Sequence, residues 1–182
     1  MKLIILDRDG VINYDSDKYV KNVEEWEPIP ESLEAIANFT QLGYKIVVCT
    51  NQSGIGRGLF TVEQLNCIHE KMHKMVEQSG GKIAAVFFCP HTDEDNCNCR
   101  KPKAGMILDI CERFNIESVA KVMLVGDSDR DLEAIDLAGG IPVLVKTGNG
   151  KKTLAKGNVP QGTLVFENLL AVSEYLMAKD ND

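Results

Sequence analysis

Short apolar runs alternate along this chain with segments that place apolar residues at helical spacing, and this alternation restricts the possible folds most strongly. Residues 3–6 are continuously apolar, and residues 44–49 repeat the pattern after the helix breaker Gly43. Because apolar and polar positions do not alternate regularly within them, both runs predict strands that are buried on two faces. Further strands are predicted at residues 83–88, 122–125, 141–145 and 164–166.

Helices are predicted between these strands. Pro30 marks the start of one helix, and Thr61 with Gln64 forms a capping box at the start of a second, which ends at Gly80 and Gly81. The other predicted helices cover residues 106–114, 132–138 and 169–176. Such alternation implies right-handed crossovers and helices on both faces of the sheet. We therefore expect a three-layer α/β fold with a Rossmann-like, mainly parallel sheet, forming a single domain over residues 1–182.

Composition excludes several classes of function. The 182 residues carry 20 Lys and Arg against 27 Asp and Glu, a formal charge of -7, without a basic block that could neutralise the phosphates of a nucleic acid. The apolar start of the chain is interrupted by Asp7, and no apolar run approaches the ~20 residues of a membrane span. We expect a cytoplasmic protein that binds neither nucleic acid nor membrane.

Polar residues with distinct chemistry follow the predicted strands. Asp7 and Asp9 follow the first strand, Thr50 the second and Asp127 the fourth, while Lys101 lies in the loop after the third. Loops that leave the carboxyl ends of parallel strands share one edge of the sheet, so we expect these side chains to converge. Carboxylates, a hydroxyl and a cation in one site are typical of phosphoryl transfer with Mg²⁺. The alternative for each residue alone is a solvated turn.

The residue types suggest a role for each group. Asp7 and Asp127 supply hard oxygen ligands for Mg²⁺. Asp9 stands two residues from Asp7, so it can act as an acid on the far side of a phosphate that Asp7 attacks. Thr50 and nearby backbone N–H groups can bind phosphate oxygens, and Lys101 adds positive charge.

Two further features leave alternatives open. Asp131 either orients Lys101 or waters on Mg²⁺, or it caps the next helix. Residues 147–150, followed by Lys151 and Lys152, either bind an anion or form a mobile turn.

Cysteine spacing points to a second metal. Cys89, His91, Cys97 and Cys99 offer four ligands within eleven positions, enough to enclose a tetrahedral, structural Zn²⁺. The alternative is a set of unliganded or paired side chains, although a disulfide between Cys97 and Cys99 would be strained. A metal bound at Cys99 would fix the path of the two residues that follow it. Cys49, Cys67 and Cys111 lie in apolar segments and are expected to be buried free thiols.

A competing zinc motif occurs in the second predicted helix. His69, Glu70 and His73 match H-E-x-x-H, the helix signature of zinc peptidases. The apolar stripe of this helix predicts core packing and leaves Glu70 and His73 facing solvent, while the other histidine, His91, is already assigned to the cysteines. A zinc peptidase therefore remains a minor alternative.

Taken together, these motifs resemble a known family. Asp7-Arg8-Asp9-Gly10, the segment 50–54, Cys89-Pro90-His91 and the segment 97–102 are similar to the haloacid dehalogenase (HAD) superfamily, in its histidinol-phosphatase-like branch. The resemblance implies that Asp7 becomes an aspartyl-phosphate. It also implies that Asp9 protonates the leaving oxygen, then activates water, and gives its backbone carbonyl to the Mg²⁺ bound by Asp7 and Asp127.

The resemblance also implies a substrate and its contacts. It indicates a phosphatase without a large cap domain that removes the C7 phosphate of a heptose 1,7-bisphosphate, in the biosynthesis of nucleotide-activated heptose for lipopolysaccharide. We expect the protein to be a monomer. Histidinol phosphate is the alternative substrate, and a non-catalytic phosphate sensor is an alternative of another class. The residues implied in substrate binding are Asp15, Tyr19, Asn51, Gln52, Ser53, Arg100 and Lys101.

Overall fold

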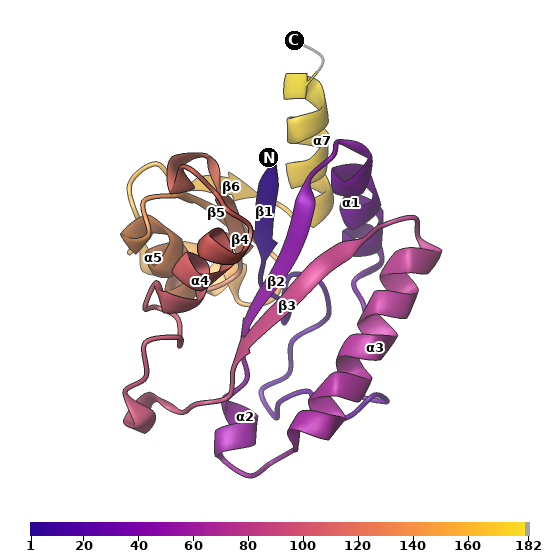
Figure 1. Cartoon of the computed structure of the whole chain (residues 1–182), viewed down its shortest axis with the longest axis vertical. Coiled ribbons are helices and arrows are strands. Elements are labelled where there is room, and N and C mark those ends of the chain that lie inside the picture. Colours follow the sequence, from indigo (N-terminus) through magenta and orange to yellow (C-terminus); the bar gives the residue numbers. More distant parts are fainter. Residues whose placement is uncertain (181–182) are drawn as a thin grey trace.

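The fold is built on one six-stranded sheet (Figure 1). The structure is a computed structural model, and it describes residues 1–180. Every pairing between the strands is parallel, and their order is β3-β2-β1-β4-β5-β6. The strands are β1 (Leu3–Leu6), β2 (Lys45–Asn51), β3 (Ile83–Cys89), β4 (Met123–Gly126), β5 (Ile141–Val145) and β6 (Leu164–Phe166). The six predicted strands are thus confirmed, and the sheet is parallel throughout.

The predicted helices are present with the expected signals. Helix α1 begins at Pro30, and α3 follows the capping box that Thr61 and Gln64 form. The helices are α1 (Pro30–Gln41), α2 (Ser53–Gly56), α3 (Val62–Gln78), α4 (Gly105–Arg113), α5 (Asp129–Leu137), α6 (Gly150–Lys156) and α7 (Leu169–Asp180). Neither α2 nor α6 was predicted, because one is a single turn and the other has no apolar stripe. None of the helices within residues 1–180 is long and apolar enough to cross a membrane.

Two apolar cores lie on opposite faces of the sheet. Along β1, Ile4 and Leu6 pack into a core with α1, α3 and α7, while Leu3 and Ile5 pack into a second core with α4 and α5. Figure 1 shows the same division, with α4 and α5 on one side of the strands and α1 and α3 on the other. This confirms the three-layer α/β fold, and no element of the size of a cap domain is inserted among the described residues.

One expectation about the cysteines is wrong. Cys49 and Cys111 are buried free thiols, as expected, but Cys67 is exposed. The buried stripe of α3 runs through Leu65, Ile68 and Met72, and position 67 falls on the opposite side of this helix.

Strand order determines where a ligand can bind. β1 lies between β2 and β4, so the chain moves from β1 towards one edge of the sheet and later returns to build the other half from β4. Beyond the carboxyl ends of two such strands the connecting loops diverge, and a crevice opens between them. Asp7 follows β1 and Asp127 follows β4, so the two predicted Mg²⁺ ligands stand at this point.

The burial of α5 yields a stability prediction with an internal control. Leu132 is fully buried, whereas Leu137, on the same helix, is 70% exposed. Because deleting buried methyl groups loses transfer free energy and leaves a cavity, Leu132→Ala should lower the free energy of unfolding by about 2–5 kcal/mol. Leu137→Ala should change it by less than about 0.5 kcal/mol. Urea unfolding followed by circular dichroism measures both; equal losses would contradict this packing.

Candidate functional site

A cleft of about 500 Å³ opens at the carboxyl ends of the strands. All the side chains predicted to act on a phosphate or on Mg²⁺ line it: Asp7, Asp9, Asp15, Tyr19, Thr50, Asn51, Gln52, Ser53, Arg100, Lys101 and Asp127. They come from segments that are far apart in the sequence. The parallel sheet therefore brings these residues together. Their positions at the ends of the predicted strands had indicated this.

Three carboxylates form a cluster in the cleft. Single oxygens of Asp7, Asp127 and Asp131 all lie within 4.8 Å of one another. Burial, followed by the charge of Asp131, raises the pKa of Asp127 to about 7. The same two causes raise the pKa of Asp7 well above its usual range. The cluster therefore carries more negative charge than its protein surroundings neutralise.

Lys101 is the single cation that reaches the centre of this cluster among residues 1–180. Its Nζ lies 2.6 Å from Asp131 Oδ1 and 3.1 Å from Asp7 Oδ1, and it donates to the carbonyl of Cys49 at 2.6 Å. Burial alone would lower the pKa of Lys101, but Asp131 and Asp7 outweigh it and raise the pKa, so the ammonium stays charged. One lysine cannot balance three carboxylates.

The donor set fits a magnesium ion. Mg²⁺ prefers hard oxygen ligands and binds through one or two carboxylates together with substrate phosphate. The excess of buried carboxylate over cation is the electrostatic demand that a divalent ion satisfies. Asp7 and Asp127 are in place to hold it, and Asp9, two residues after Asp7, lines the same cleft.

Two glycines allow Asp127 to sit this close to the loop after β1. Gly10 has a φ of +80°, and a Cβ there would stand 2.2 Å from Asp127 Oδ2. A Cβ on Gly148 would also stand 2.2 Å from that oxygen, which accepts a 2.7 Å hydrogen bond from the backbone N–H of Asn149. Neither of the two roles expected for residues 147–150 describes this contact: the loop orients Asp127.

The carboxylate of Asp9 is turned to a different set of partners. Arg8 donates to both of its oxygens, and Asn13 and Gln52 each donate to one of them at 2.9 Å. Burial would raise the pKa of Asp9, but the Arg8 charge and these hydrogen bonds outweigh it and lower the pKa. In this arrangement Asp9 is an ionised carboxylate.

The last residues of β2 and the residue that follows it organise the adjoining wall of the cleft, and Thr50, which was expected just after the strand, lies within it. The Gln52 side chain bridges Thr50 Oγ1 and Asp9 Oδ2, in each case at 2.9 Å. Asn51 hydrogen bonds to both the backbone N–H and the carbonyl of Lys101, at 3.1 and 3.0 Å, and so fixes that residue in place. Near the entrance, Asp15 accepts a hydrogen bond from Asn149.

Asp131 combines both roles that the sequence left open. Its Oδ2 accepts from the backbone N–H and the hydroxyl of Ser128, which forms the capping box of α5, while its Oδ1 pairs with Lys101. Carboxylates have two oxygens, so one residue both caps the helix and holds the lysine.

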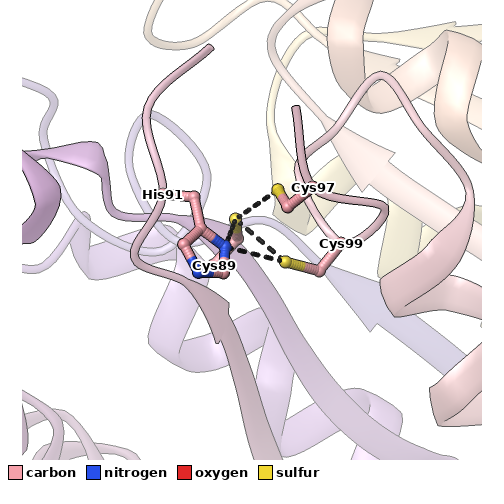
Figure 2. A group of neighbouring side chains, drawn as sticks. All are labelled: Cys89, His91, Cys97 and Cys99. Carbon is pink, nitrogen blue, oxygen red and sulfur yellow. Dashed lines mark hydrogen bonds between the residues drawn. The ribbon is translucent and has the colours of Figure 1, made fainter. Parts of the chain in front are cut away.

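The four predicted zinc ligands form a separate cluster (Figure 2). Cys89 and His91, at and just beyond the end of β3, face Cys97 and Cys99 on the returning loop. Their contacts are 3.6 Å from Cys89 to His91 Nδ1, 3.7 Å from Cys89 to Cys97, 3.3 Å from His91 Nδ1 to Cys99 and 3.2 Å from Cys89 to Cys99. All these cysteines are free. Ligand atoms around one tetrahedral zinc stand about 3.3–3.8 Å apart, so the cluster has the size of such a site.

The first histidine of the H-E-x-x-H motif on α3 contacts an arginine. His69 is buried, with Nε2 3.3 Å from Nη1 of Arg8, while Glu70 is exposed and His73 is half-buried rather than facing solvent as expected. In the described part of the chain, no cluster that could hold a metal includes His69 or His73. These contacts of His69, like the contact of Asn149 with Asp127, had no signal in the sequence beyond the residue types.

The chain is similar to known phosphatases in sequence and in fold. Residues 2–140 match the family model of polynucleotide kinase 3 phosphatase. The D-glycero-β-D-manno-heptose-1,7-bisphosphate 7-phosphatase of Neisseria meningitidis is 58% identical, over 99% of this chain and 97% of its own. A solved structure of D,D-heptose 1,7-bisphosphate phosphatase from B. bronchiseptica, complexed with magnesium and phosphate, has a TM-score of 0.96 at 54% identity and covers 98% of this chain and 99% of its own. A HAD-like phosphatase structure from Mesorhizobium loti has a TM-score of 0.80 at 28% identity, over 97% and 87% of the two chains.

The glycine contacts predict a loss of magnesium binding. Gly10→Ala should push Asp127 aside and weaken Mg²⁺ binding by at least about tenfold, the usual range for a disturbed ligand support. Gly43 has a nearly identical φ of +78° but nothing within 4 Å of its Cβ position. Gly43→Ala should therefore cost only stability, about 1–2 kcal/mol, and leave Mg²⁺ affinity intact. Calorimetric titration with Mg²⁺ compares the two variants, and equal Mg²⁺ affinities would refute the role of Gly10.

Proposed function

Because the chain belongs to the D-glycero-β-D-manno-heptose-1,7-bisphosphate 7-phosphatase family, in the HAD superfamily, we propose that it hydrolyses the C7 phosphate ester of that bisphosphate with the help of Mg²⁺. The observation that carries this proposal is the cluster of Asp7, Asp127, Asp131 and Lys101 at the crevice between β1 and β4. The neighbouring structure from B. bronchiseptica was solved with magnesium and phosphate, which supports Mg²⁺ as the cofactor.

In the first step, an oxygen of Asp7 attacks the phosphorus of the ester. The bond between phosphorus and the C7 oxygen breaks, its electron pair stays on the sugar oxygen, and Asp9 supplies the proton that neutralises it. Lys101, 3.1 Å from Asp7, offsets negative charge on the transferring phosphoryl group, while Thr50 and nearby N–H groups bind its oxygens. Bound Mg²⁺ supplies further charge neutralisation there.

In the second step, water attacks the phosphorus of the aspartyl-phosphate. Asp9, deprotonated by the first step, accepts a proton from this water, the bond to Asp7 breaks, and inorganic phosphate leaves. Asp9 thus acts first as an acid and then as a base. The low pKa that Arg8 and its other partners give Asp9 suits the base form, and it makes the protonated form a stronger acid towards the sugar oxygen. This dual role separates a phosphatase from a phosphate sensor, which needs no such acid.

Cations on the rim that form no ion pair in the described part of the chain favour a bisphosphate over histidinol phosphate. Arg57, Arg130 and Lys152 line the same cleft and form no ion pair within residues 1–180. A second phosphate gains charge-assisted contacts from such cations, whereas the ammonium group of histidinol phosphate is repelled by them. Sequence reasoning had included only Lys152, and only as part of a candidate anion-binding loop.

We also propose that Cys89, His91, Cys97 and Cys99 bind a structural Zn²⁺. Four protein ligands leave no open position for substrate or water, so such an ion stabilises the loop and takes no part in the chemistry. The loop leads from Cys99 directly into Arg100 and Lys101. A zinc ion that stabilises this loop would therefore help to place the buried Lys101.

The proposal extends to the setting of the reaction. We propose a single domain over residues 1–182 that acts as a monomer in the cytoplasm, without nucleic acid or membrane partners. Its product would be an intermediate of nucleotide-activated heptose for lipopolysaccharide.

The nucleophile is tested by Asp7→Asn. An amide of the same size cannot form the aspartyl-phosphate, so kcat should fall on the order of 10⁴-fold or more. Phosphate release from heptose 1,7-bisphosphate and from histidinol phosphate, each with and without Mg²⁺, measures activity and substrate preference together. Asp136→Asn, which changes an exposed carboxylate of α5, is the matched control and should match the parent. Activity of the Asp7 variant at the parental rate would end the proposal.

The zinc loop is tested by Cys99→Ala. Loss of the metal should displace Lys101 and lower kcat by about 10–100-fold, the range seen when support of a site is lost. Cys67→Ala, which removes an exposed thiol outside the cluster, should keep both activity and zinc. Metal analysis by mass spectrometry accompanies the assay. A fully active parent protein that contains no zinc would refute this role.

A further inference from the structure

A buried arginine connects the proposed general acid with a buried histidine. Arg8 is fully buried and donates from Nε to Asp9 Oδ1 at 3.2 Å, and from Nη2 to Oδ1 and Oδ2 at 2.9 and 3.1 Å. Its remaining nitrogen, Nη1, lies 3.3 Å from Nε2 of His69 on α3. Across residues 1–180, Nη1 has no other hydrogen-bond partner.

The chemistry of the pair determines the state of the histidine. A guanidinium has only donors, so Nε2 of His69 must accept the hydrogen bond, and a neutral ring then carries its proton on Nδ1. Burial, and next the Arg8 charge, lower the pKa of His69 to about 3, which agrees with a neutral ring. His69 therefore supplies a fixed acceptor on a long helix that is anchored in the core through Ile68 and Met72.

The position of the guanidinium controls the position of Asp9. Arg8, Asn13 and Gln52 together place five hydrogen bonds on the Asp9 carboxylate, and Arg8 makes three of them. Without His69, Nη1 would be buried and unpaired, at a cost that favours movement of the guanidinium towards another acceptor. Such movement would carry the main partner of Asp9 with it.

We propose that His69 is a positioning residue for proton transfer: through Arg8, it sets where the Asp9 carboxyl group stands when it protonates the leaving oxygen and when it later accepts a proton from water. This inference rests on the proposed function, because it assigns Asp9 as the group that moves the proton. Neither His69 nor Arg8 exchanges a proton in either step. The H-E-x-x-H spacing then has a role in this protein that requires no metal.

Leaving-group chemistry separates this role from simple core packing. The nitrophenolate ion of p-nitrophenyl phosphate departs without protonation, whereas a sugar alkoxide requires an acid. The constant kcat/KM reports the steps up to departure of the leaving group. A packing defect would lower kcat/KM for both esters alike, while a misplaced Asp9 lowers it only for the sugar ester.

The experiment compares three variants on p-nitrophenyl phosphate and on heptose 1,7-bisphosphate, the sugar ester. His69→Leu, which has no acceptor, should lower kcat/KM for the sugar ester by about tenfold, part of the 10²–10⁴-fold that acid–base catalysis contributes, and leave the nitrophenyl ester within twofold. His69→Gln, whose amide oxygen can accept from Arg8, should restore most of the loss. His73→Leu, at the other histidine of the motif, is the control and should match the parent on both esters.

Equal losses on both esters, no loss for His69→Leu, or no recovery with His69→Gln would overturn the proposal. If His69→Leu does not fold, two other measurements test the proposal. They are the ratio of kcat/KM for the two esters in His69→Gln, relative to the parent, and the imidazole ¹⁵N spectrum of the parent protein. The chain has three histidines, so the His69 ring can be assigned by substitution. A ring protonated on Nδ1 supports the proposal, and one protonated on Nε2 overturns it. A parent protein inactive on both esters would instead overturn the proposed function, and this role with it.

Discussion

The repulsion among three buried carboxylates is the constraint on which the site depends. Asp7, Asp127 and Asp131 lie within 4.8 Å of one another, and among residues 1–180 a single ammonium, that of Lys101, stands between them. Buried charges of one sign are unfavourable unless cations or hydrogen bonds compensate for them. The structure therefore has an affinity for a divalent cation before that cation binds, and much of the surrounding loop architecture maintains the charge imbalance.

This constraint explains why Lys101 is so firmly held although it comes from an irregular loop. Loops are more mobile than the elements they connect, yet this ammonium must remain within hydrogen-bond distance of two particular carboxylates. Asn51 binds the backbone of Lys101 on both sides, and the carbonyl of Cys49 and Oδ1 of Asp131 accept from Nζ. Cys99, the last residue of the cysteine and histidine cluster, lies two residues before Lys101. A metal at that cluster would anchor the loop, which has only a short 3₁₀ turn, Asp93–Asp95, between β3 and α4.

Sequence reasoning could predict the features that depend on local pattern. Apolar runs and caps located every strand and the main helices, and the strand ends located Asp7, Thr50 and Asp127. Contacts between distant segments carried no such signal. The approach of Gly148 to Asp127 and the contact between His69 and Arg8 follow from how loops and α3 pack on the sheet. Cys67 shows the same limit, because an apolar neighbourhood in the sequence does not determine which side of a helix is buried.

The histidine motif illustrates why spacing alone does not establish chemistry. Residues four apart on a helix share a face, so the two imidazoles of H-E-x-x-H point towards the group that packs against that face. In a peptidase that partner is a zinc ion. Here it is the guanidinium of Arg8, 3.3 Å from the nitrogen of His69 that would have to ligate a metal. Because this guanidinium is itself a cation and occupies the lone pair, a dication at the same place would be repelled and would lack its ligand. The neighbour across the interface, not the motif, therefore decides that this helix supports an acid–base group instead of a metal.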